Sequence, residues 1–79
     1  MQPFIGMGGN PDGPDLPMGF GMHLAQNPQA LEAYGNMTYG QRTRVVEYIQ
    51  AAVTGEDSAN RIANAIQSLR ENDLRPFGL

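Results

Sequence analysis

The chain has 79 residues, a formal net charge of −3 and no cysteine, so it is bounded to one small domain without a disulfide, a thiolate nucleophile or a cysteine zinc site. Its five cationic side chains are all arginines and lie from Arg42 onward, a balance that does not favour nucleic-acid binding, which depends largely on neutralised phosphates. No stretch has the length and apolarity of a membrane span, and the N-terminus has no signal-peptide pattern, so we expect a cytoplasmic protein.

The first seventeen residues are predicted to be a flexible segment. Between Gly6 and Asp15 the sequence GMGGNPDGPD holds four glycines and two prolines, which oppose regular structure. Pro14 stands where a phosphate-binding P-loop needs lysine, and Pro11 stands where a dinucleotide fingerprint needs its third glycine. The acidic residues also lack the final glutamate of a calcium loop. We therefore expect no metal, phosphate or cofactor site in this segment.

Two short helices are predicted directly after Pro17. The first covers Met18–Gln26 and is weakened by its glycines. Asn27 and Pro28 predict the start of the second, because Asn caps helix N-termini and Pro is favoured at the first helical position. This second helix is expected to end near Asn36. Its predicted apolar side consists of Ala30, Leu31 and Tyr34.

A longer third helix is predicted to begin at Thr38. Thr38 and Gln41 have the spacing of a capping box, in which two side chains reciprocally satisfy backbone N–H groups. Gly55 is the predicted residue just after its C-terminus. Helical periodicity predicts that its buried face consists of Val45, Val46, Ile49, Ala52 and Val53.

A fourth helix is predicted over about 58–72, with Asp57 or Ser58 as its N-cap. Apolar residues recur in it once per helical turn. The predicted stripe consists of Ala59, Ile62, Ala63, Ile66 and Leu69. Pro76 excludes helical continuation beyond it.

No run of alternating β-branched residues predicts a strand. The sequence therefore predicts an all-α fold, a three- to four-helix bundle over 18–72. A disordered segment at 1–17 and a short disordered tail at 73–79 are expected to flank it.

The chain from Leu16 to Glu71 also resembles known families. The stretch LPMGFGMHLAQNPQALEAY is similar to a pattern in short helical proteins of Gram-positive bacteria, Leu-Pro-x-Gly-Phe-Gly-Met-x-Leu-Ala followed by Asn, Ala and an aromatic residue. The layout is also similar to the C-terminal helical region of the bacteriocin-protection, OmpD-associated family. There an Arg-containing helix like YGQRTRVVEYIQAA precedes one with Arg-Ile like ANRIANAIQSL. The resemblance implies a helical fold, but no reaction or defined ligand.

Catalytic chemistry is not predicted. His23 is the single histidine, and it has neither a nucleophile at a recognisable spacing nor a histidine or cysteine companion that would complete a metal site. We therefore expect a non-enzymatic protein with no catalytic residue, no metal and no cofactor.

A protein-interaction or accessory role is the preferred hypothesis, with either an unidentified protein or a second copy as the partner. Met18, Met22 and Met37 flank the short helices, and methionine adapts to irregular partner surfaces, although it also fills small cores. Arg42 lies by rotation among the apolar residues of the third helix. Either its stem covers the core edge while the guanidinium reaches water or pairs with Glu32, or the guanidinium anchors an anion through bidentate binding.

The outer faces of the two longer helices supply further candidates. Arg44 and Tyr48 lie four residues apart and are predicted to form a stacked or ion-paired surface cluster that a partner can contact. Arg61 and Asn64 lie on the predicted outer face of the fourth helix, and such residue types read base edges. The alternative function is therefore a weak nucleic-acid-binding module resembling a helix-turn-helix.

Overall fold

The computed structural model describes residues 16–79, so the prediction of a flexible segment at 1–17 falls almost entirely outside the described residues. Within the described part the chain is helical and contains no strand, which confirms the predicted all-α fold. The elements are α1 (Phe20–Ala25), α2 (Pro28–Gly35), α3 (Tyr39–Gln50), α4 (Gly55–Arg70) and a 3-10 turn, η1 (Arg75–Phe77).

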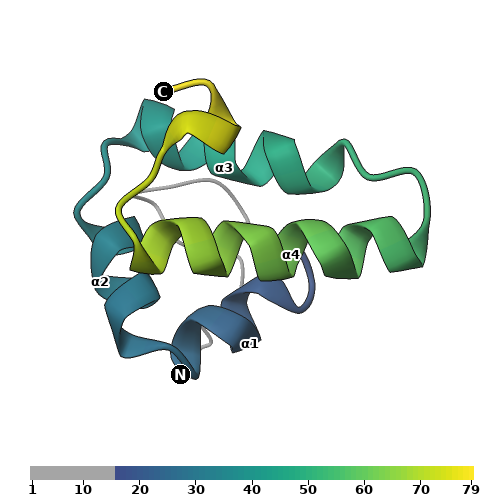
Figure 1. Cartoon of the computed structure of the whole chain (residues 1–79), viewed down its shortest axis with the longest axis horizontal. Helices are drawn as coiled ribbons and strands as arrows, with labels where there is room; N and C mark the ends of the chain where they lie inside the picture. Colours follow the sequence, from purple (N-terminus) through teal and green to yellow (C-terminus); the bar gives the residue numbers. More distant parts are fainter. Residues whose placement is uncertain (1–15) are drawn as a thin grey trace, which may run out of the picture.

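Helix α4 lies at the centre of the fold (Figure 1). It runs antiparallel to α3 on one side, while α1 and α2 pack across it on the other. The core consists of one cluster to which every helix and η1 contribute, including Phe20, Leu24, Val45, Ile49 and Leu69, all at most 2% exposed.

A glycine turn places the largest fully buried side chain of the core. The backbone N–H of Phe20 donates to the carbonyl of Pro17 at 3.1 Å, and Gly19 between them has a φ of +91°, a conformation that L side chains rarely adopt. Phe20 is thereby fully buried, with its ring edge-on to Tyr34 at a centroid distance of 5.5 Å. The Leu-Pro-x-Gly-Phe pattern therefore has a structural explanation, a turn that inserts an aromatic ring into the core.

The capping box of α3 is confirmed, whereas the predicted start of α4 was wrong. The Thr38 hydroxyl accepts from the Gln41 N–H, and the Gln41 side chain accepts from the Thr38 N–H. Helix α4 begins earlier than Ser58, because the Thr54 hydroxyl accepts from the Asp57 N–H at 3.0 Å. Gly55 is thus the first helical residue of α4 rather than the stop after α3.

Several residues predicted to be buried lie at the surface. Leu31 is 47% exposed on α2. Val53 is 90% exposed because α3 ends at Gln50 and leaves it in the connecting loop. On α4, Ala59 and Ala63 are exposed and Ala65 is buried. At about 100° per residue, Ala63 rotates away from the stripe of the large apolar residues, whereas Ala65 falls beside it. Ala59 also falls on the side of this stripe but lies near the N-terminal end of α4, before the first buried residue of that helix.

The last seven residues pack against the bundle, so the prediction of a disordered tail was wrong. Asn72 has a φ of 55°, and the Asp73 N–H donates to the Ser68 carbonyl at 2.9 Å, a Schellman-type helix ending that turns the chain back. Arg75 then donates from Nε to the Asp73 carboxylate at 2.8 Å. This and the Arg75 backbone hydrogen bond lower the pKa of Asp73 to about 2. Phe77 follows and is only 5% exposed.

Candidate functional site

Three of the predicted partner-binding residues form one cluster between α3 and α4. The Arg61 Nη1 donates to the Tyr48 carbonyl at 2.8 Å, and the guanidinium carbon lies 4.9 Å from the centroid of the Tyr48 ring. Asp57 accepts from Arg61 Nε at 3.4 Å, and Asn64 Nδ2 donates to the Tyr48 hydroxyl at 3.5 Å. Phe77 packs edge-on against the Tyr48 ring at 5.4 Å. We call these five residues the Tyr48–Arg61 cluster.

The Tyr48–Arg61 cluster joins α3 to α4 and does not form an open site. The guanidinium of Arg61 was predicted to point outward from α4, but it turns toward α3 and its side chain is only 30% exposed. It satisfies a carbonyl near the C-terminus of α3, where a cation also complements the helix dipole. The arginine that stacks on Tyr48 is therefore Arg61 and not Arg44, whose Nη1 lies beside Gly78.

Arg42 covers the C-terminal end of α2. Its Nη1 donates to the carbonyl of Gly35 at 3.4 Å, so its side chain has an internal role. Its positive charge also acts on the hydroxyl of Tyr34. That hydroxyl is buried and has no hydrogen-bond partner among the described residues. Burial raises the pKa of Tyr34, and the charge of Arg42 opposes the rise. Anion binding by Arg42 stays a prediction.

The two methionines beside α1 are exposed. Met18 is 96% and Met22 is 64% exposed, whereas the intervening Phe20 and the following Leu24 are buried. Since the buried residues fix α1 against the bundle, Met22 is held on the outer side of a positioned helix, and Met18 lies in the turn just before it. Met37, by contrast, is 7% exposed and belongs to the core.

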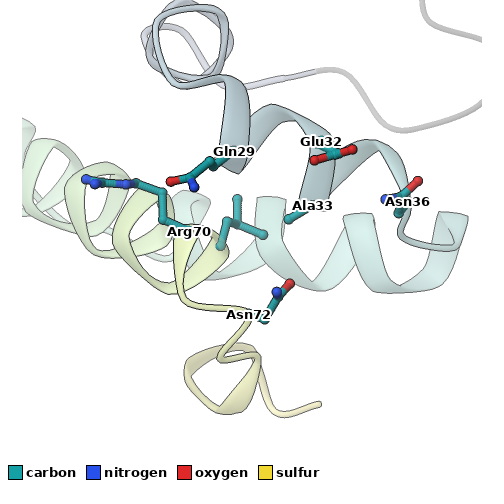
Figure 2. A pocket seen from close by; sticks show the side chains of 7 residues that line it. Gln29, Glu32, Ala33, Asn36, Arg70 and Asn72 are labelled. Atoms are coloured by element: carbon teal, nitrogen blue, oxygen red, sulfur yellow. The ribbon is translucent and has the colours of Figure 1, made fainter.

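A polar groove between α2 and the end of α4 was not predicted from the sequence (Figure 2). It has a volume of about 210 Å³ and adjoins a second hollow of about 350 Å³ that shares Gln29 and Arg70 with it. Its lining residues are Gln29, Glu32, Ala33, Asn36, Leu69, Arg70 and Asn72. We call this hollow the α2–α4 groove.

The sequence carries a partial signal for the α2–α4 groove. Gln29, Ala33 and Asn36 recur at helical spacing and therefore share one side of α2. Nothing local, however, indicates that the Schellman-type ending of α4 brings Asn72 to the same place. The groove is a tertiary feature built from two segments more than thirty residues apart.

Residues 16–79 contain no group of three or more His, Cys, Asp or Glu side chains that could hold a metal ion. His23 is exposed on α1. Among the same residues, no helix has the length and apolar character that crossing a membrane requires.

The fold defines a small all-helical domain with a central helix, a pair of exposed methionines and a polar groove. Residues 14–72 match the model of the bacteriocin-protection, YdeI or OmpD-associated family, and the chain belongs to that family. No curated protein and no solved structure matches this chain. The family match confirms the resemblance to the bacteriocin-protection family, whereas the likeness to proteins of Gram-positive bacteria stays a prediction. The match ends at Asn72, so the packed tail lies beyond it.

Proposed function

We propose that this protein is a non-enzymatic accessory module that binds a partner protein through Met18 and Met22. The observation that carries the proposal is the exposure of these side chains: Met22, 64% exposed, lies on α1 opposite its buried side, and Met18, 96% exposed, lies in the turn just before α1. Exposed apolar side chains on a fixed element are typical of interaction surfaces, and methionine packs well against irregular surfaces. The family name, which refers to protection and association, also supports an accessory role.

Burial of the two methionines supplies part of the free energy that recognition requires. Full burial of a Met side chain contributes about 1.5–3 kcal/mol. Two of them supply a few kcal/mol, which offsets only part of the entropy cost of association, so the complex also needs contacts from residues around the two methionines.

Site-specific photo-crosslinking tests the proposal. A benzophenone amino acid at position 18 is expected to form protein adducts in cells of the source organism, and Met18→Gln with Met22→Gln is expected to abolish binding of the captured partner. Position 53 is the matched control, because Val53 is 90% exposed but lies in the loop between α3 and α4. Equal crosslinking from positions 18 and 53, or none from position 18, would refute this surface. Sedimentation of the purified protein distinguishes a second copy from a different partner.

The nucleic-acid alternative has less support. Arg61, the arginine nearest the centre of the predicted recognition surface, is committed to Tyr48 and Asp57, which leaves few cations on α4 for phosphate contacts. A titration with fluorescent random duplex DNA at low and moderate salt is expected to show no tight, salt-dependent binding.

A further inference from the structure

The methionines of residues 16–79 differ sharply in their access to solvent. Met18 and Met22 are exposed, whereas Met37 is buried in the core. The sequence contains no cysteine, so no thiol competes with these thioethers for an oxidant. Oxidation of a sulfur-bearing side chain depends on its exposure. Among the described residues, Met18 and Met22 are therefore the side chains that an oxidant in solution reaches first.

The backbone holds both exposed side chains in place without help from their sulfur atoms. Met18 lies in a turn that the Phe20 N–H closes by donating to the Pro17 carbonyl at 3.1 Å. Met22 lies on α1 between Phe20 and Leu24, which anchor this helix in the core. Because neither methionine belongs to the core, a change in the polarity of its side chain leaves the contacts that position α1 intact.

The reaction of a methionine with hydrogen peroxide needs no catalytic group of the protein. A lone pair of the thioether sulfur attacks one peroxide oxygen, and an S–O bond forms as the O–O bond breaks. The proton on the transferred oxygen passes to the leaving hydroxide, so the products are a sulfoxide and water. Sulfur loses the two electrons that the peroxide gains. The sulfoxide is polar where the thioether was apolar, and methionine sulfoxide reductases reverse the change.

We infer that Met18 and Met22 are an oxidation site at which peroxides convert an apolar surface into a polar one while the fold stays intact. Met37 is protected, because an oxidant reaches it only when the core opens. A consequence that rests on the proposed function is the loss of partner binding, since a sulfoxide that enters an apolar contact loses its hydrogen bonds to water. Oxidation therefore acts on the partner-binding surface and not on the stability of the domain.

Peptide mapping of the full chain tests the selectivity. Samples treated with hydrogen peroxide and quenched at intervals are cleaved after glutamate and before aspartate, which places Met18 and Met22 in residues 15–32 and Met37 in residues 33–47. Oxidation of the first peptide is expected to be more than about tenfold faster than that of the second. The thermal midpoint of the oxidised protein is expected to fall by less than about 3 °C. Equal rates, or a larger fall, would overturn the inference.

Retention on a phenyl column measures the change in surface character without any partner. The oxidised wild-type protein is expected to elute earlier than the untreated protein. The matched control is Met18→Leu with Met22→Leu, which keeps both positions apolar, cannot be oxidised there and retains Met1 and Met7, which lie outside the described residues. Peroxide is expected to leave its retention unchanged. An equal shift in this variant would assign the effect to other methionines and overturn the inference.

The captured partner provides a separate test of the consequence for binding. Peroxide is expected to weaken binding by the wild-type protein at least about tenfold, methionine sulfoxide reductases are expected to restore it, and the leucine variant is expected to bind equally before and after treatment. Unchanged binding after oxidation of both residues would contradict the inference. Selective oxidation without any crosslink from position 18 would refute the proposed function alone, whereas unselective oxidation with a captured partner would refute the inference alone.

Discussion

The guanidinium of Arg61 lies over the ring of Tyr48, at 4.9 Å from its centroid, and donates to the backbone carbonyl of the same residue at 2.8 Å. One side chain of α4 thus contacts both the ring and the backbone of one residue of α3. Asp57 also holds the guanidinium by accepting from Nε at 3.4 Å. This arrangement joins the two longest helices near the loop that connects them.

Replacement of Arg61 is expected to destabilise the fold. Arg61→Ala removes a cation–π contact and a charged hydrogen bond to a carbonyl and is expected to lower the free energy of unfolding by about 2 kcal/mol. Arg61→Lys is expected to lose about half of that, since an ammonium cannot stack on the ring and also donate in two directions. Urea denaturation followed by circular dichroism measures both. A loss below about 0.5 kcal/mol for Arg61→Ala would mean that the contact is a neutral surface pair.

Replacement of two glycines by alanine is expected to change the stability of the fold in opposite directions. Gly19→Ala is expected to cost about 1–2 kcal/mol, because φ is +91° although a Cβ would have room at 3.5 Å from Ile62. Gly40→Ala lies in α3 with open space around the added Cβ and is expected to gain about 0.5–1 kcal/mol from helix propensity. Thermal unfolding of both variants checks the prediction. The same sign of change in melting temperature for both would contradict it.

Two substitutions compare the stability contributed by Thr54, the observed N-cap of α4, with that contributed by Ser58, one of the caps predicted from the sequence. Thr54→Ala removes the hydroxyl that accepts from the Asp57 N–H and is expected to cost about 1 kcal/mol. Ser58→Ala is expected to be neutral, because Ser58 lies inside the helix. Chemical denaturation distinguishes the two residues. A larger cost for Ser58→Ala would return the start of the helix to the position that the sequence predicted.

The buried hydroxyl of Tyr34 predicts that its removal does not destabilise the fold. Because it has no hydrogen-bond partner among residues 16–79, Tyr34→Phe is expected to leave stability unchanged or to raise it by up to about 1 kcal/mol. Burial raises the pKa of Tyr34 above 10.0, so above that pH the unfolded chain loses its proton first. The wild-type protein therefore loses stability as the pH rises through this range.

The pH dependence supplies the control for Tyr34. In Tyr34→Phe the alkaline loss of stability is expected to be smaller than in the wild-type protein, whereas the stability near neutral pH stays the same or rises. A loss of more than about 1 kcal/mol near neutral pH would show that the hydroxyl has a partner that stabilises the fold.

Local signals predicted those parts of the fold that local chemistry decides. The capping box of Thr38 and Gln41 fixed the start of α3 because both partners lie within one turn of chain. The start of α4 was missed because Thr54 and Ser58 are both competent caps. The choice between them depends on where α3 ends, and that end lies at Gln50.

The candidate site was harder to predict than the fold. Rotation about a helix axis places Arg61 on a face of α4, but it cannot say that Tyr48 offers a ring and a carbonyl there. The direction of a long side chain depends on partners that it reaches on a neighbouring helix. The tail shows the same limit, because the burial of Phe77 depends on an aromatic ring that lies on α3.

By itself, the sequence determined that this protein is a helical bundle without cysteine chemistry, since apolar residues recur at helical spacing from Thr38 to Leu69 and helical propensity acts over a few neighbouring residues. Only the tertiary structure decided which longer-range features exist: the contact between Arg61 and Tyr48, the burial of Phe77, and the groove between Gln29 and Asn72. These features join residues distant in the chain, and the packing energy that brings such residues together is not encoded in any one segment.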